Sequence, residues 1–148
     1  MIFFALKRVY ARKYLEKEIS PMPLIRISFV EGKPADFGGR IGDAVHQSMV
    51  ETINCPPLDR FQLIQEHKRN DLIYDPNYLD IPRTDDIVII QITLNEGRTV
   101  DLKRALYKRI TELLRQSLGI RPEDVLINLI EVKKENWSFG NGVASYAQ

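Results

Sequence analysis

The sequence is poor in the residues that build disulfides and metal centres. Its 148 residues contain one cysteine, Cys55, and two histidines, His46 and His67. A single thiol cannot form an internal disulfide, and two widely separated histidines lack the ligand spacing of a zinc site. We therefore expect no metal. Because disulfides belong to oxidising compartments, the cysteine usage favours a cytoplasmic location.

The chain also lacks a charge bias and a long apolar run. Lys and Arg number 21 against 20 Asp and Glu, so the formal net charge is +1. This balance provides no positive field for nucleic acid, and we expect no nucleic-acid partner. No apolar run approaches the roughly 20 residues that cross a bilayer. The first segment also lacks the small-residue cleavage site of a secretory signal, and we do not expect a membrane partner.

The first 22 residues differ from the rest in charge. They carry five basic and two acidic side chains, placed between apolar residues at helical spacing. One interpretation is a basic amphipathic helix that binds a membrane surface or a partner protein. The other is upstream DNA read in frame before a true start at Met22, whose removal leaves Pro23 as the first residue. We treat residues 1–22 as an N-terminal extension and residues 23–148 as one domain.

The domain begins with a strand-helix-strand pattern. Residues 23–30 are apolar and β-branched in the manner of a strand, and Gly32 lies in the turn that follows. Apolar residues recur at helical spacing over residues 34–53, where the glycines indicate close packing. A proline pair then stops the helix, and residues 60–66 form the second predicted strand.

The second half repeats this plan. We predict a strand over residues 87–94, a helix over 99–118 and a strand over 125–132. Thr99 is the expected N-cap of the helix, and Gly119 ends it. The predicted buried face of this helix consists of Leu102, Leu106, Ile110, Leu113 and Leu118.

A shift of 65 residues superposes the two halves. It places the following residues on one another: Glu31 on Glu96, Gly32 on Gly97, Lys33 on Arg98 and Asp59 on Asp124. These matches indicate an internal duplication, although any two such units share a turn glycine. Duplicated β-α-β units predict an α+β fold with a four-stranded mixed sheet and two helices on one face, because the crossovers are right-handed. The strands are apolar at nearly every position, so we expect a partner subunit to cover the other face.

The remaining segments are rich in turn residues. Residues 68–86 contain many Asn, Asp and Pro residues and predict a loop with a small hairpin. Near the C-terminus, two aromatic residues precede the dipeptide Asn141-Gly142, which predicts a terminal hairpin with a tight turn.

Five segments in order resemble the tautomerase superfamily, most closely the branch that includes malonate semialdehyde decarboxylase. They are the strand that begins at Pro23 and residues 56–61, 81–84, 97–99 and 137–142. The resemblance covers nearly all of the chain after the extension. It implies a 4-oxalocrotonate tautomerase-like fold, usually assembled as a homotrimer, and an enzyme that needs no cofactor and uses an amino-terminal proline.

The implied chemistry depends on the proline nitrogen. Inside a chain this nitrogen is an amide, whereas at the N-terminus it is a secondary amine, whose pKa falls towards neutrality among apolar walls and near a cation. Such an amine can move a proton next to a carbonyl group. The resemblance implies Pro23 as catalytic base and acid, Arg98 as the binder of a substrate carboxylate and Asp59 as an auxiliary residue. It also places three aromatic residues in an apolar pocket wall: Trp137, Phe139 and Tyr146.

These residues also have plain structural interpretations. Asp59 follows a proline pair, where Asp commonly forms a turn. Arg98 precedes a helix start, which is normally a solvated position. Trp137 and Phe139 would by pattern alone belong to a core, and Cys55 is interpreted as a small buried residue.

One loop departs from the decarboxylase. That enzyme carries two arginines in the loop after the third strand, whereas residues 94–98 retain only Arg98. One guanidinium beside Glu96 lacks the second cation that favours loss of carbon dioxide. We therefore expect tautomerisation of a small 2-oxo acid such as phenylpyruvate, with a decarboxylase-like lyase acting on a 3-oxo acid as the alternative. If residues 1–22 persist, Pro23 is an amide, and the alternative is a non-catalytic trimeric interaction protein.

Overall fold

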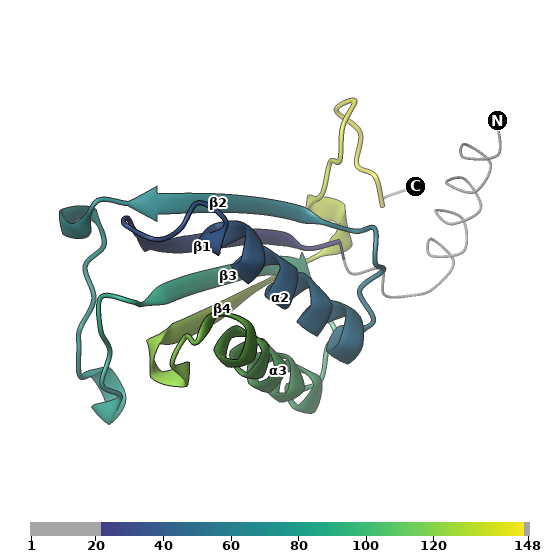
Figure 1. The fold of residues 1–148 in the computed structure, drawn as a ribbon. Helices are drawn as coiled ribbons and strands as arrows, with labels where there is room; N and C mark the ends of the chain where they lie inside the picture. Colours follow the sequence, from purple (N-terminus) through teal and green to yellow (C-terminus); the bar gives the residue numbers. More distant parts are fainter. Residues whose placement is uncertain (1–21, 147–148) are drawn as a thin grey trace.

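A computed structural model describes residues 22–146 and shows a four-stranded sheet with both helices on one face (Figure 1). The sheet has the order β2-β1-β3-β4 and consists of β1 (Leu24–Val30), β2 (Phe61–His67), β3 (Val88–Asn95) and β4 (Val125–Val132). β1 is parallel to β2 and antiparallel to β3, which is parallel to β4. The predicted α+β class with a mixed sheet is confirmed. The predictions for residues 1–21 lie outside the described residues.

The core lies between the sheet and the helices α2 (Phe37–Ile53) and α3 (Val100–Leu118). Alternate residues of β1 point into this layer, because successive side chains of a strand face opposite ways. These buried residues are Ile25, Ile27 and Phe29. The helix α2 begins three residues later than predicted, at Phe37. The apolar residues that recur at helical spacing are buried; they are Phe37, Ile41, Ala44, Val45, Met49 and Ile53.

Two glycines of α2 allow the helix to approach β2. A Cβ atom on Gly38 would collide with the side chain of Ile64, and one on Gly42 would collide with Gln62. The close packing predicted from these glycines is therefore confirmed at both positions. Gly39 instead faces open space.

The buried face of α3 differs from the prediction. Its fully buried residues are Leu106, Ile110 and Leu114. Leu114 was not expected, and Leu102 is 40% exposed although it continues the same four-residue spacing. Leu102 lies in the first turn, where its N–H is bonded to the side chain of the predicted N-cap, Thr99. Gly119 ends the helix with a φ of 65°, as expected for a C-cap glycine.

The pairing of the strands supports the duplication. Leu24 pairs with Phe61 and Val88 pairs with Val125, so the parallel pairs of both halves have the same offset of 37 residues. The turn glycines that the 65-residue shift superposes also agree, because Gly32 and Gly97 both adopt a positive φ, at 97° and 118°. The two halves are therefore alike in their register and in their turns.

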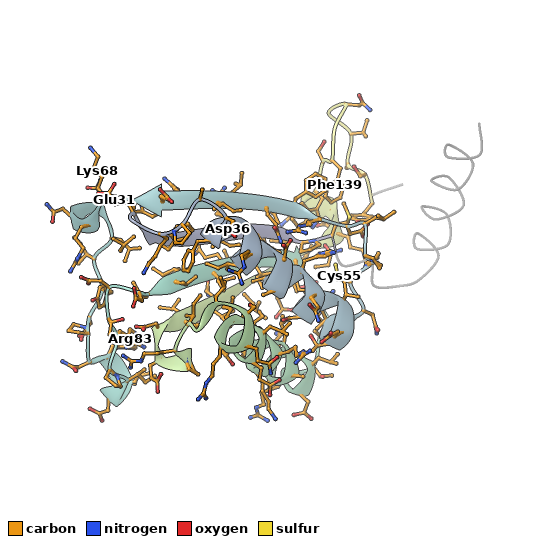
Figure 2. All side chains as sticks on the ribbon, viewed as in Figure 1. Glu31, Asp36, Cys55, Lys68, Arg83 and Phe139 are labelled. Carbon is orange, nitrogen blue, oxygen red and sulfur yellow. The ribbon has the colours of Figure 1, made fainter. Side chains whose placement is uncertain are left out.

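This topology brings four chain segments to one end of the sheet. β1 and β2 begin there, and β3 and β4 end there, as the pairing directions require. We call it the site end; it is the right-hand end in Figure 1, where the C-terminal tail also lies. Figure 2 shows Cys55 and Phe139 at this end and Lys68 and Arg83 at the opposite end.

The second face of the sheet carries exposed apolar side chains. Val125, Ile127 and Leu129 of β4 pack against the core, so the residues that alternate with them point away from the helices. The large apolar side chains of the two edge strands that point this way are Phe61, Leu63, Leu126 and Ile130, each between 39% and 50% exposed. This face matches the one that we expected a partner subunit to cover.

The hairpin predicted in residues 68–86 is wrong. This segment forms two 3-10 turns, Arg69–Asp71 and Tyr78–Asp80, and no strand. Leu72 is buried against Val30 and Ile87 instead of pairing with a second strand. Prolines within the segment also remove backbone donors that a hairpin would need.

The C-terminal tail turns back as predicted, but without strand pairing. Asn141 and Gly142 have φ values of 59° and 67°, as in the tight turns that join hairpin strands. The N–H of Ser145 donates to the carbonyl oxygen of Trp137 at 3.2 Å.

Within residues 22–146, none of the helices has the length and apolar character needed to cross a membrane.

Candidate active site

Pro23 lies at the site end, directly before β1, and is buried. Leu24 pairs with Thr93 of the antiparallel strand β3, so the register continued by one residue places Pro23 opposite Leu94. The end of β3 is therefore the neighbour of Pro23 on one side of β1, and Arg60 before β2 is its neighbour on the other side.

Arg98 is buried beside this end of β3. Its side chain is 8% exposed, and its Nη1 donates to the carbonyl oxygen of Asn95 at 2.7 Å. The other terminal nitrogen, Nη2, is buried with no hydrogen-bond partner among the described residues. Burial lowers the pKa of the Arg98 guanidinium. The interpretation of Arg98 as a solvated residue is wrong, and its open donor can take an acceptor such as a carboxylate.

Glu131 supports the turn that carries Arg98. Its carboxylate accepts the N–H of Gly97 at 3.2 Å and forms an ion pair with Lys103 of α3. The hydrogen bond from Lys103 is the main cause that lowers the pKa of Glu131, and the bond from Gly97 adds to it. β4 and α3 thus both hold the turn before Arg98.

Asp59 lies in the segment between α2 and β2. Its N–H donates to the carbonyl oxygen of Pro56 at 3.0 Å, so it does form the predicted turn. The side chain is half-buried, and burial raises the pKa of Asp59, while the charge of His46 acts in the opposite direction. Nε2 of His46 lies 2.8 Å from the carbonyl oxygen of Pro57 and ties α2 to this segment.

Cys55 is buried beside Asp59. Its side chain is 2% exposed, and the Sγ is 3.6 Å from the carbonyl oxygen of Asp59. Burial raises the pKa of the Cys55 thiol to about 12, with a further rise from Asp59 and an opposing effect from Arg98. The charges of Asp59 and Arg98 therefore both act on this thiol. The predicted small buried cysteine is confirmed.

Aromatic rings line the site end. Trp137 and Phe139 are stacked with centroids 5.2 Å apart, and Phe139 is 5.4 Å from Tyr146 in an edge-to-face arrangement. Phe61 at the start of β2 continues the stack, 6.4 Å from Phe139. Trp137 is half-buried and Phe139 is 37% exposed, so these rings lie outside the buried core. We call Trp137, Phe139 and Tyr146 the aromatic wall.

Two residues at this end were not predicted. Asn95 ends β3 and is 1% exposed; besides its contact with Arg98, its Oδ1 accepts the Nε1–H of Trp137 at 2.8 Å. An asparagine directly after the apolar residues 87–94 is visible in the sequence, but its burial is not. Phe61 belonged to a segment of the resemblance, but nothing local indicated that it would stack on the tail.

The site residues do not line either of two surface hollows on the described part of the chain. One hollow, of about 320 Å³, lies at the opposite end of the sheet between Arg69 and Pro76. The other, of about 200 Å³, lies between α2 and α3 beside Arg40. Among residues 22–146, no three His, Cys, Asp or Glu side chains come together as metal ligands would.

Sequence comparison relates the chain to enzymes. Two sequence models described as tautomerase enzyme match residues 59–140 and 23–80. The probable tautomerase YusQ of Bacillus subtilis (strain 168) is 41% identical over 123 residues, which cover 83% of this chain and 97% of YusQ. The probable tautomerase YrdN of the same organism is 30% identical over 125 residues, covering 84% of this chain and 96% of YrdN.

Solved structures show the same fold. A malonate semialdehyde decarboxylase inhibited by 3-bromopropiolate is 36% identical with a TM-score of 0.77, covering 83% of this chain and 93% of that one. Another malonate semialdehyde decarboxylase is 28% identical with a TM-score of 0.76, covering 83% and 95%. A fused 4-OT symmetric trimer, 24% identical with a TM-score of 0.68 and coverages of 84% and 98%, shares the fold. The chain belongs to the tautomerase enzyme family.

Proposed function

We propose that the protein interconverts the enol and keto forms of a small 2-oxo acid, with Pro23 as an N-terminal catalytic base and acid. The observation that carries this proposal is the buried Arg98 guanidinium, whose Nη2 has no partner among the described residues. It lies at the same end of the sheet as Pro23, which directly precedes β1. A buried donor without an acceptor is costly, by about 1–3 kcal/mol. A substrate carboxylate would supply the missing acceptor.

Two observations support a chain that begins at Pro23. One of the tautomerase sequence models begins its match at Pro23. YusQ is matched over 97% of its length while 17% of this chain stays outside the match, so YusQ is shorter by roughly 20 residues. A start at Met22 followed by removal of the methionine would leave Pro23 with a free secondary amine.

The reaction needs only a proton transfer. When an enol becomes a 2-oxo acid, the hydroxyl at C2 loses a proton and C3 gains one, so the double bond moves from C2–C3 to C2–O. The amine of Pro23 is suited to this transfer because burial disfavours its charged form. Arg98 would bind the carboxylate and stabilise negative charge on the enolate oxygen. No cofactor enters these steps.

Asp59 and the aromatic wall complete the proposed site. A raised pKa makes Asp59 hold a proton more tightly than an exposed carboxyl does, which suits it to pass a proton to or from a substrate oxygen. Trp137, Phe139 and Tyr146 provide flat apolar surface, which fits the ring of an aryl 2-oxo acid such as phenylpyruvate. The neutral thiol of Cys55 adds no charge to compete with the substrate.

We further propose that the enzyme is a homotrimer. The exposed apolar side chains on the second face of the sheet would be covered by neighbouring subunits. The fused 4-OT relative is described as a trimer, which supports the same arrangement here. A cytoplasmic location stays a prediction from the single cysteine.

A decarboxylase-like lyase is the second candidate, favoured by the similarity to two malonate semialdehyde decarboxylases. The end of β3 and the turn after it disfavour decarboxylation, because they supply one arginine, Arg98, and a neutral Asn95. Loss of carbon dioxide from a 3-oxo acid would benefit from more positive charge at this position.

Both candidates can be tested in one experiment on the protein produced from its own gene. The assay follows ketonisation of phenylenolpyruvate and, separately, release of carbon dioxide from malonate semialdehyde. We expect ketonisation, lost in Pro23→Ala and weakened by a rise in KM in Arg98→Lys. Carbon dioxide release without ketonisation would establish the lyase, and full ketonisation by Pro23→Ala would refute the role of Pro23.

A further inference from the structure

Asn95 connects two parts of the site end that are distant in sequence. Its backbone carbonyl oxygen accepts Nη1 of Arg98 at 2.7 Å, and its side-chain Oδ1 accepts Nε1–H of Trp137 at 2.8 Å. The asparagine is the last residue of β3 and is 1% exposed. One buried residue therefore contacts both the guanidinium and the aromatic wall.

The tail stands outside the sheet and contacts two of its strands: Phe139 stacks on Phe61 of β2, and Trp137 bonds Asn95 of β3. After the 3-10 turn Lys134–Asn136 it projects from the site end and folds on itself through Ser145, which bonds the backbone of both Trp137 and Phe139 (Figure 1). These bonds shape the tail but do not place it relative to β3. The bond between Trp137 and Asn95 does, because it crosses from the tail to the strand.

We propose that Asn95 is a positioning residue that sets the aromatic wall relative to the carboxylate-binding guanidinium of Arg98. This inference rests on the proposed function. A substrate whose carboxylate binds Arg98 can then place its ring along Trp137 and Phe139 without either group moving. Asn95 thereby selects for ligands that carry a flat apolar group at a fixed distance from a carboxylate.

A purely structural Asn95 would behave differently. If its side chain only satisfied the indole N–H, its removal would lower stability and leave the relative affinity for different carboxylates unchanged. The positioning role instead predicts a change in selectivity. The ratio of two affinities is informative because a general loss of folded protein or of Arg98 geometry lowers both affinities together.

The test measures binding of two carboxylates by calorimetry, using the full chain produced from its own gene. 3-Phenylpropanoate carries a ring and propanoate does not. The wild type should bind 3-phenylpropanoate more tightly. In Asn95→Leu this preference should fall by up to about tenfold, the effect of one lost hydrogen bond, with propanoate affinity unchanged because the backbone contact to Arg98 remains.

Three further variants make the result specific. Asn95→Asp keeps the acceptor for Trp137 but adds negative charge near Arg98, so it should weaken both ligands and retain the preference. Trp137→Phe keeps a ring but removes the N–H donor; the preference should fall, and Asn95→Leu should then lower it no further. Asn70→Leu, in the turn at the opposite end of the sheet, is the matched control and should leave both affinities unchanged.

Tryptophan fluorescence provides an independent measurement, because Trp137 is the single tryptophan of the chain. Its emission should shift in Asn95→Leu and stay near that of the wild type in Asn95→Asp. If Asn95→Leu does not fold, Trp137→Phe still tests the preference.

Two failures can be told apart. A wild type that prefers 3-phenylpropanoate, together with an unchanged preference in both Asn95→Leu and Trp137→Phe, would overturn the positioning role alone. A wild type that binds neither carboxylate would overturn the proposed carboxylate site, and the positioning role with it.

Discussion

The carboxylate of Glu131 accepts the backbone N–H of Gly97 at 3.2 Å, one residue before Arg98. Glu131 therefore restrains the turn of the proposed carboxylate binder, while its negative charge also acts on the Arg98 guanidinium. The restraint of the turn should favour binding of a substrate carboxylate, whereas the negative charge should disfavour it. Substitutions of Glu131 can separate these two effects.

Glu131→Gln keeps an acceptor for Gly97 and removes the charge. We expect the KM for phenylenolpyruvate to fall about twofold, because less negative charge then competes with the substrate carboxylate. Glu131→Ala removes the acceptor as well, and its KM should lie several-fold above that of Glu131→Gln. Steady-state kinetics of both variants test this; equal KM values in the two would show that the bond to Gly97 does not restrain Arg98.

Replacing Arg98 should separate activity from stability. Arg98→Met removes a buried cation with an open donor, so we expect the thermal midpoint to stay level or rise by roughly 2–4 °C. The kcat/KM for a carboxylate substrate should fall by about 100-fold or more. The exposed Arg104 on α3 provides the control, since Arg104→Met should change neither quantity. A large loss of stability in Arg98→Met would mean that the guanidinium is a structural group.

The raised pKa of Asp59 predicts a pH-dependent stability difference. A carboxyl group with a pKa raised by folding binds its proton more tightly in the native state, so its contribution to stability is full below the unfolded value of about 3.9 and is lost as the pH rises through the native value. Asp59→Asn should therefore raise the free energy of unfolding at pH 7. Below about pH 3.9 the variant and the wild type should be equally stable. Urea unfolding at both pH values measures this difference. A higher free energy of unfolding for Asp59→Asn that persists in acid would show that the charge of Asp59 is not its cause.

Cys55 should be chemically inert in the native protein. Burial raises the pKa of its thiol to about 12, so the thiolate is scarce at pH 8. A thiol reagent such as DTNB should react only as fast as the protein unfolds, and rapidly in denaturant. Cys55→Ala should lower stability while leaving most of the activity. A fast native reaction with DTNB would place the thiol in an open site.

Much of the fold could be predicted because its signals are local. The bounds of β4 were predicted to the residue, and Thr99 and Gly119 cap α3 as their residue types indicate. Leu102 and Leu114 were misplaced because helical spacing defines a stripe but not where the sheet beneath it ends. The loop after β2 was misread because burial of Leu72 replaced the strand pairing that its pattern suggested.

The candidate site could be predicted only in part. The resemblance named Arg98, but its burial depends on the turn at Gly97 and on Glu131 of a different strand. Asn95 escaped notice because its side-chain partner, Trp137, is 42 residues away in sequence. Long-range contacts of this kind leave no periodic signal in either segment.

The most direct test of the whole account is the intact mass of the protein produced from its native gene with its own upstream DNA, combined with phenylenolpyruvate turnover by the same sample. We expect a mass that begins at Pro23 and ketonisation that is lost when Met22 is retained. A mass that includes residues 1–22 would make Pro23 an amide, and ketonisation by that longer chain would contradict the catalytic role of the proline.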